Sequence, residues 1–182
     1  MILDAGSGLG SLIQPWKNAG YRTLGIDSDN NSSAEIKINF LKIEKWEYEQ
    51  PSLVICNPPF NGYGRKLASE VWLDKIISLF GKNIPLILFT PVGLRNNLTQ
   101  KSQRYQKFLK GDYPAIKTII TLPKNIFTGV LFHSEILVFN IDGLPAHYFL
   151  PELTEIQVEI EKFATIFEQI NTATTPKNTG QS

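Results

Sequence analysis

The chain has 182 residues, of which 42% are hydrophobic and 19% charged, and its formal net charge is +1. This length and apolar fraction suit one globular domain with a core and exclude a disordered chain. The single cysteine, Cys56, excludes an internal disulfide framework and a cysteine-rich zinc site. No apolar run reaches the ~18 residues of a membrane helix and no signal peptide is visible, so we expect a cytoplasmic protein without membrane or metal partners.

Strands alternate with helices over the first two thirds of the chain. Hydrophobic patterns predict strands over residues 1–3, 21–26, 35–40, 53–56 and 85–90, and helices over residues 9–19, 68–80 and 103–109. This alternation predicts a parallel sheet with helices on both faces. Two further strands, over residues 116–122 and 135–141, are too close together for a helical crossover and should pair antiparallel. The predicted fold is therefore α/β, with a mostly parallel sheet and an antiparallel edge strand.

The last part of the sequence differs in pattern from the rest. Residues 1–150 are predicted to form the folded domain, followed by an amphipathic helix over residues 151–171. Residues 172–182 are polar and rich in threonine and asparagine, so we expect a disordered tail there.

The net charge conceals an asymmetry along the chain. Residues 1–60 contain five basic and seven acidic residues, residues 61–130 contain 11 and three, and residues 131–182 contain two and seven. The middle segment therefore has the electrostatics of a polyanion-binding surface. A solvated helix face is the alternative interpretation, and charge alone does not decide between the two.

A glycine-rich turn follows the first predicted strand. Gly6, Gly8 and Gly10 allow the backbone to turn tightly and to approach a ligand closely. Their GxGxG spacing differs from the GxGxxG of dinucleotide-binding folds. Asp4 places a carboxylate at the strand tip, where it would repel a pyrophosphate and attract a sulfonium or ammonium group.

Polar residues also stand at the ends of the next two predicted strands. Asp27 is placed to accept hydrogen bonds from a ribose diol, and Asn39 with Phe40 suits the edge and face of an adenine. Taken singly, the glycines could be a simple turn and Asp27 a helix cap. Three such features at successive strand ends predict a site for a nucleoside cofactor.

The sequence Asn57-Pro58-Pro59-Phe60 follows the fourth predicted strand. The two prolines restrict the backbone and lack N–H groups, so the carbonyls there can point rigidly at a guest. The Asn57 side-chain oxygen and a nearby carbonyl can accept two hydrogen bonds from one amine. Such bonds take the amine out of conjugation and free its lone pair to attack a methyl group. Phe60 offers a surface on which a planar base or amide can stack.

In this order, these motifs resemble those of the S-adenosylmethionine-dependent N6-adenine DNA methyltransferases with the gamma-type motif order. Residues 90–93, 104–109, 122–127 and 136–139 are similar to the end of the catalytic domain in type I modification subunits. The resemblance implies a Rossmann-like class I methyltransferase fold in residues 1–150. In that domain, the usual upstream segment and a target-recognition domain would be absent.

The resemblance implies a role for each motif. The S-adenosylmethionine-binding residues would be Asp4, Ala5, Gly6, Ser7, Gly8, Gly10, Asp27, Asn39 and Phe40. The catalytic residues would be Asn57, Pro58, Pro59 and Phe60, which would act on a flipped adenine. Phosphate contacts would come from Arg65, Lys66, Arg95, Lys101, Arg104, Lys107 and Lys124.

The partners implied are DNA and a specificity or restriction subunit. Two alternatives stay open from the sequence. The same tetrapeptide could methylate an RNA base or a protein glutamine amide, because each presents a conjugated NH2 group. The chain could also be a non-catalytic, methyltransferase-like nucleic-acid-binding protein.

Overall fold

The computed structural model describes residues 1–60, 62–96, 98–123 and 133–150. The predicted helix over residues 151–171, the predicted tail and Lys124 lie outside these ranges. Within them, no helix is both long enough and apolar enough to cross a bilayer.

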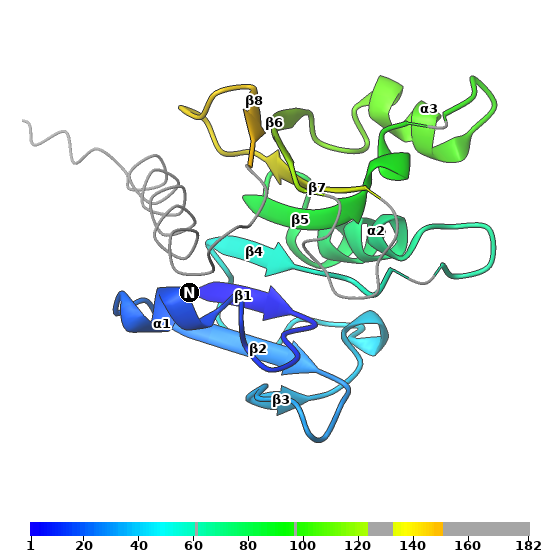
Figure 1. Ribbon diagram of the computed structural model, residues 1–182. Helices are drawn as coiled ribbons and strands as arrows, with labels where there is room; N and C mark the ends of the chain where they lie inside the picture. The colour runs from blue at the N-terminus through cyan, green and yellow to red at the C-terminus, as the bar shows by residue number, and fades with distance from the viewer. Residues whose placement is uncertain (61, 97, 124–132, 151–182) are drawn as a thin grey trace, which may run out of the picture.

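Strands of the described residues form one eight-stranded sheet in the order β3-β2-β1-β4-β5-β7-β6-β8, with β3 and β8 at its two ends (Figure 1). The strands are β1 (Ile2–Ala5), β2 (Thr23–Asp27), β3 (Ile36–Lys37), β4 (Leu53–Cys56), β5 (Leu86–Pro91), β6 (Ile116–Thr121), β7 (Ser134–Phe139) and β8 (His147–Phe149). Only β7, among these strands, runs against its neighbours, β5 and β6. The predicted mostly parallel sheet with antiparallel pairing toward one edge is therefore confirmed.

The helices are shorter than the sequence pattern predicts near the N-terminus. They are α1 (Gln14–Asn18), α2 (Ala68–Phe80), α3 (Gln103–Lys110) and the 3-10 turns η1 (Phe40–Lys42) and η2 (Val92–Leu94). The helix predicted over residues 9–19 begins only at Gln14, because the glycine turn extends to Gly10, where φ is +84°. Pro15 lies in the first turn of α1, where its missing N–H costs nothing.

Two other sequence predictions need correction in detail. The strand predicted over residues 35–40 is only two residues long, because the Asn39 side chain accepts a hydrogen bond from Leu41 N and starts η1. The edge strand β8 was not predicted, since three residues give too short a pattern to detect. It pairs parallel with β6.

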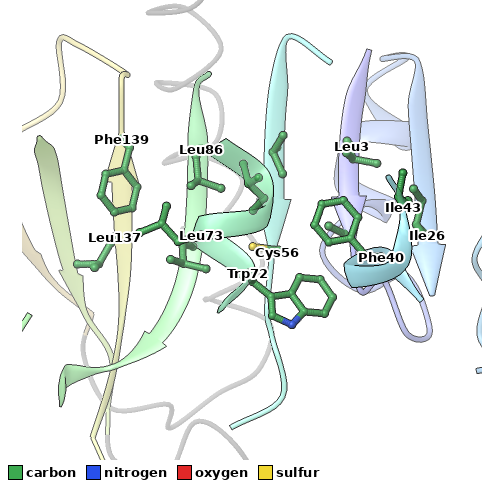
Figure 2. Close-up of a cluster of buried hydrophobic side chains, with 14 of the residues drawn as sticks. Leu3, Ile26, Phe40, Ile43, Cys56, Trp72, Leu73, Leu86, Leu137 and Phe139 are labelled. Carbon is green, nitrogen blue, oxygen red and sulfur yellow. The ribbon is translucent and has the colours of Figure 1, made fainter. Parts of the chain in front are cut away.

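The sheet carries a hydrophobic core on each face, because successive strand residues point to opposite sides. Leu3, Val54 and Leu86 pack on one face with Trp72 and Leu73 of α2 (Figure 2). Ile2, Ile55, Ile87 and Val138 pack on the other face with Trp16 of α1. The prediction of helices on both faces is thus confirmed.

Candidate functional site: a cavity at the carboxyl ends of the strands

Strands β1, β2 and β4 are parallel, so their carboxyl ends meet at one edge of the sheet. A cavity of about 310 Å³ opens at this edge. Its lining residues come from the glycine turn, the ends of β2 and β4, η1 and α2: Gly6, Ile26, Asp27, Ser28, Asn39, Phe40, Asn57, Pro59, Tyr63 and Trp72. Ligands of open α/β sheets bind at such a place. Six residues predicted for the site therefore line one cavity, although they come from four motifs that lie apart in the sequence.

The glycine turn is fixed by hydrogen bonds to β2. The backbone N–H groups of Gly6 and Ser7 donate to the carbonyl of Ile26, at 2.7 and 3.0 Å. Gly6 has φ +78°, and a Cβ there would lie only 2.8 Å from Cη2 of Trp72. Both the backbone conformation and the packing therefore require glycine at position 6.

Asp27 ends β2 and connects the turn to the cavity. Its two carboxylate oxygens accept from Gly8 N and Asp29 N, each at 2.8 Å. Each oxygen has a further lone pair, and Asp27 also lines the cavity, so the side chain can still accept from ligand hydroxyls.

Asp4 is fully buried beside the turn, and neither carboxylate oxygen has a hydrogen-bond partner within the described residues. Burial, with the nearby acids Asp27 and Glu35, raises the pKa of Asp4 to about 7. Glu35 is itself held by Lys17, at 2.6 Å, and by Gly25 N. An unpaired buried acid with two acidic neighbours suits a cationic ligand group.

Asn39 and Phe40 line the cavity together with Asn57 and Pro59. The side-chain Oδ1 of Asn39 accepts from Leu41 N at 2.9 Å, which leaves the side-chain NH2 group to donate. Phe40 is buried and stacks on Trp72, with ring centroids 5.2 Å apart and an interplanar angle of 25°. Figure 2 shows the two rings next to each other. This stack fixes Phe40 and Trp72 together as one part of the cavity lining.

Asn57 lies directly after β4, and its side-chain oxygen is buried without a partner in the part of the chain that is described. Pro58 is buried, Phe60 is half-buried, and Pro59 is exposed and lines the cavity. A buried acceptor without a donor is costly, so this oxygen is poised for a donor on a ligand.

Three of the predicted phosphate-binding residues pair with buried or half-buried acids. Arg104 pairs with Glu70 at 2.7 Å, and Arg95 pairs with Glu135 at 2.8 Å. Lys107 pairs with Asp74. These acids come from α2 and β7, and a count of charges along the basic segment alone does not reveal them.

The remaining predicted basic residues are more accessible. Lys66 pairs with Asp74 at 3.3 Å and its side chain is 42% exposed. Arg65 and Lys101 are exposed, and neither forms an ion pair with a described residue. Contact with nucleic acid stays a prediction for all of these residues.

The sequence did not single out Trp72 and Tyr63 as site residues. Trp72 has the spacing of a core residue on α2, and Tyr63 lies in a loop three residues after the tetrapeptide. Their only sequence signal is an aromatic ring close after Asn57-Pro58-Pro59-Phe60. Among the described residues, no three histidine, cysteine, aspartate or glutamate side chains are grouped to hold a metal ion.

Solved structures provide the comparison that decides the fold. A Streptococcus thermophilus type I restriction-modification methyltransferase subunit aligns with 93% of this chain and 48% of its own, at 17% identity and TM-score 0.63. A Listeria monocytogenes protein assigned as a class I S-adenosylmethionine-dependent methyltransferase aligns with 93% of this chain and 64% of its own, at 16% identity and TM-score 0.61. A Vibrio vulnificus protein assigned as a type I modification subunit aligns with 92% of this chain and 48% of its own, at 13% identity and TM-score 0.61.

The chain has the class I methyltransferase fold. It spans less than two thirds of the length of each of these three structures. No protein-family model matches the sequence, and no curated protein matches it significantly. In this methyltransferase fold, the cavity lies where the sequence motifs come together, and the hydrogen-bonding groups of its lining residues fit S-adenosylmethionine. Among the lining residues, Asp27 has lone pairs for a diol and Asn39 can donate to a base. The buried Asp4 does not itself line the cavity, but it lies near Asp27 and adds to the negative charge there.

Proposed function

We propose that the chain binds S-adenosylmethionine in this cavity and methylates the exocyclic N6 amine of adenine in DNA. The observation that carries the proposal is the Asn57 side-chain oxygen. This oxygen is buried and has no partner within the described residues, and Asn57 lines the same cavity as Gly6 and Asp27. An acceptor for an amine therefore stands beside the residues suited to a nucleoside cofactor.

The cofactor, when bound, supplies an electrophilic methyl group. Gly6 would let the cofactor approach the backbone, Asp27 would accept hydrogen bonds from the ribose hydroxyls, and the Asn39 side-chain amide would donate to the adenine. Asp4 lies close to Asp27 and Glu35, and this negative region favours the positive charge of the methionine end. These residues thereby hold the cofactor at the edge of the sheet.

The target amine would donate its two hydrogens to Asn57 Oδ1 and to the Pro58 carbonyl. Both acceptors stay fixed, because Asn57 follows β4 directly and the prolines restrict the backbone. The two bonds would draw the nitrogen toward tetrahedral geometry and direct its lone pair at the methyl group. The new N–C bond would form as the methyl–sulfur bond breaks, with S-adenosylhomocysteine as the leaving group and one proton passing from the nitrogen to solvent. Preorganised acceptors of this kind cost little reorganisation during the reaction. Phe60 would stack on the target base.

DNA is proposed as the substrate on two grounds. Solved structures that are similar in fold include type I modification and methyltransferase subunits. Arg65 and Lys101 are exposed cations without ion-pair partners among the described residues, and both lie in the segment of charge +8 that follows the tetrapeptide. We also propose that a specificity or restriction subunit selects the sequence to be methylated.

Transfer of a labelled methyl group tests the proposal. The chain is incubated with labelled S-adenosylmethionine and, in parallel, DNA, RNA or a release-factor-type protein, and the DNA arm is repeated with lysate of the source cells. We expect N6-methyladenine in the digested DNA by mass spectrometry. Label in RNA or in glutamine would assign the other substrate, and no transfer in any arm would contradict catalysis.

The matched control uses two asparagines. Asn57→Ala should slow label transfer about 100- to 1000-fold, whereas Asn30→Ala, at an exposed position between β2 and β3, should leave it unchanged. Equal loss in both variants would show that the assay reports on folding rather than on the proposed acceptor.

A further inference from the structure

Trp72 of α2 links two parts of the cavity. Its side chain is only 6% exposed, yet it lines the cavity together with Gly6 and Phe40. It stacks on Phe40, and its six-membered ring lies so near Gly6 that a Cβ there would be 2.8 Å from Cη2. The indole therefore spans the distance between the glycine turn and Phe40.

The indole N–H of Trp72 is buried and has no acceptor within the described residues. Native proteins pair nearly all buried donors, and indole nitrogen is a donor only. In Figure 2 this nitrogen points away from the labelled core side chains. A residue needed only for packing against Phe40 would not require a donor at all. The unpaired donor in the cavity lining therefore points to an acceptor on a ligand.

We infer that Trp72 is a cofactor-positioning residue, whose ring forms the floor under the nucleoside half of S-adenosylmethionine and whose Nε1–H donates to an acceptor on that nucleoside. The inference rests on the proposed function and deepens it. The nucleoside half is assigned because Trp72 stacks on Phe40, next to Asn39, and because the cavity also includes Asp27. Adenosine presents acceptors on its purine ring and its ribose.

The variant Trp72→Phe in the full chain isolates the donor, because phenylalanine keeps an aromatic ring and removes the N–H. Calorimetric titration should show affinity for S-adenosylhomocysteine reduced about tenfold, and affinity for adenosine reduced by the same factor. The matched control is Trp46→Phe, since Trp46 Nε1 already donates to the Glu49 carbonyl at 2.9 Å and lines no part of the cavity. Its affinities should equal those of the unmodified chain.

A folded Trp72→Phe variant with unchanged affinity for S-adenosylhomocysteine overturns the inference and leaves the proposed function intact. Loss of affinity for S-adenosylhomocysteine but not for adenosine overturns the assignment to the nucleoside. If the unmodified chain binds neither ligand, the proposed function fails and the inference fails with it.

A second measurement avoids the variant and covers the case in which Trp72→Phe does not fold. In the unmodified chain, the assigned indole N–H resonance of Trp72 should move downfield on addition of adenosine, while that of Trp46 stays in place. An unmoved Trp72 resonance under saturating adenosine overturns the inference.

Discussion

At the carboxyl ends of β1 and β4, buried polar atoms of Asp4 and Asn57 have no partner among the described residues. Around α2 and α3 the situation is reversed, because the buried Glu70 pairs with Arg104, and Asp74 pairs with Lys107. The first region thus leaves buried carboxylate and amide oxygens without partners, whereas the second pairs its buried and half-buried acids within the chain.

The difference separates two uses of polar residues that look alike in the sequence. A buried ion pair whose partners satisfy each other holds elements together, whereas a buried polar atom without a partner is costly unless a ligand satisfies it. The basic segment stands out in the sequence by its charge. Part of that charge, however, lies in ion pairs that hold α3 and β7 to neighbouring parts of the fold. The unpaired atoms therefore indicate the site better than the charge does.

The largest effect on stability is expected from Arg104→Ala. It would leave Glu70 buried with an uncompensated charge, at a cost of roughly 3–5 kcal/mol in the free energy of unfolding. Urea denaturation measures this loss. The double variant Arg104→Met, Glu70→Leu should recover much of it. A single variant as stable as the parent would contradict the scaffold role of this pair.

The largest effect on the reaction is expected from Asn57→Ala. Loss of one preorganised hydrogen-bonding group should slow single-turnover methyl transfer about 100- to 1000-fold. Affinity for S-adenosylhomocysteine and the free energy of unfolding should change little, because the side-chain oxygen has no partner to lose among the described residues. A large loss of stability instead would place Asn57 with the paired scaffold residues and break the comparison.

A smaller effect, dependent on pH, is expected from Asp4→Asn. The pKa of Asp4 is raised from 3.8 to about 7. Between these two pH values, Asp4 keeps its proton in the folded chain and has lost it in the unfolded chain. The stabilisation due to that proton is complete below about pH 4 and is lost as the pH rises to about 7. The variant should match the parent near pH 4 and melt a few degrees higher at pH 8.

The control for that variant is Asp29→Asn, an exposed carboxylate two residues beyond Asp27. Its melting temperature should follow the parent at every pH. If Asp4→Asn also follows the parent throughout, burial of an unpaired acid at β1 is contradicted.

The smallest effect is expected from Lys101→Ala. This exposed residue has no ion pair within the described ranges, so its loss should change the free energy of unfolding by less than about 0.5 kcal/mol. If it contacts a phosphate, DNA affinity should fall a few-fold and the salt dependence should decrease by about one phosphate contact. Fluorescence anisotropy at several salt concentrations measures both, with Lys45→Ala as the control. Unchanged affinity would remove Lys101 from the DNA surface.

Much of this fold follows from local patterns. Buried strands such as β4 and β5 are continuous apolar runs, and α2 has clear helical spacing, so they were predictable. The turn at residues 9–13 and the shortness of β3 were not, because glycine conformation and the Asn39 cap override the apolar pattern there.

The residues of the candidate site were likewise predictable only in part. Motif residues at strand ends were predictable because parallel strands bring their carboxyl ends together. Trp72 was not, since its role depends on which face of α2 meets Gly6 and Phe40. The partners of Arg95 and Arg104 were also missed, because Glu135 and Glu70 lie 40 and 34 residues away in the sequence.

The most direct test of the central claim is a crystal structure of the chain with S-adenosylhomocysteine. We expect the ligand along the 310 Å³ cavity, with its ribose hydroxyls on Asp27, its adenine beside Asn39, and its sulfur facing Asn57. A ligand bound elsewhere, or a cavity that stays empty at saturating concentration, would contradict the claim that the unpaired polar atoms form a cofactor site.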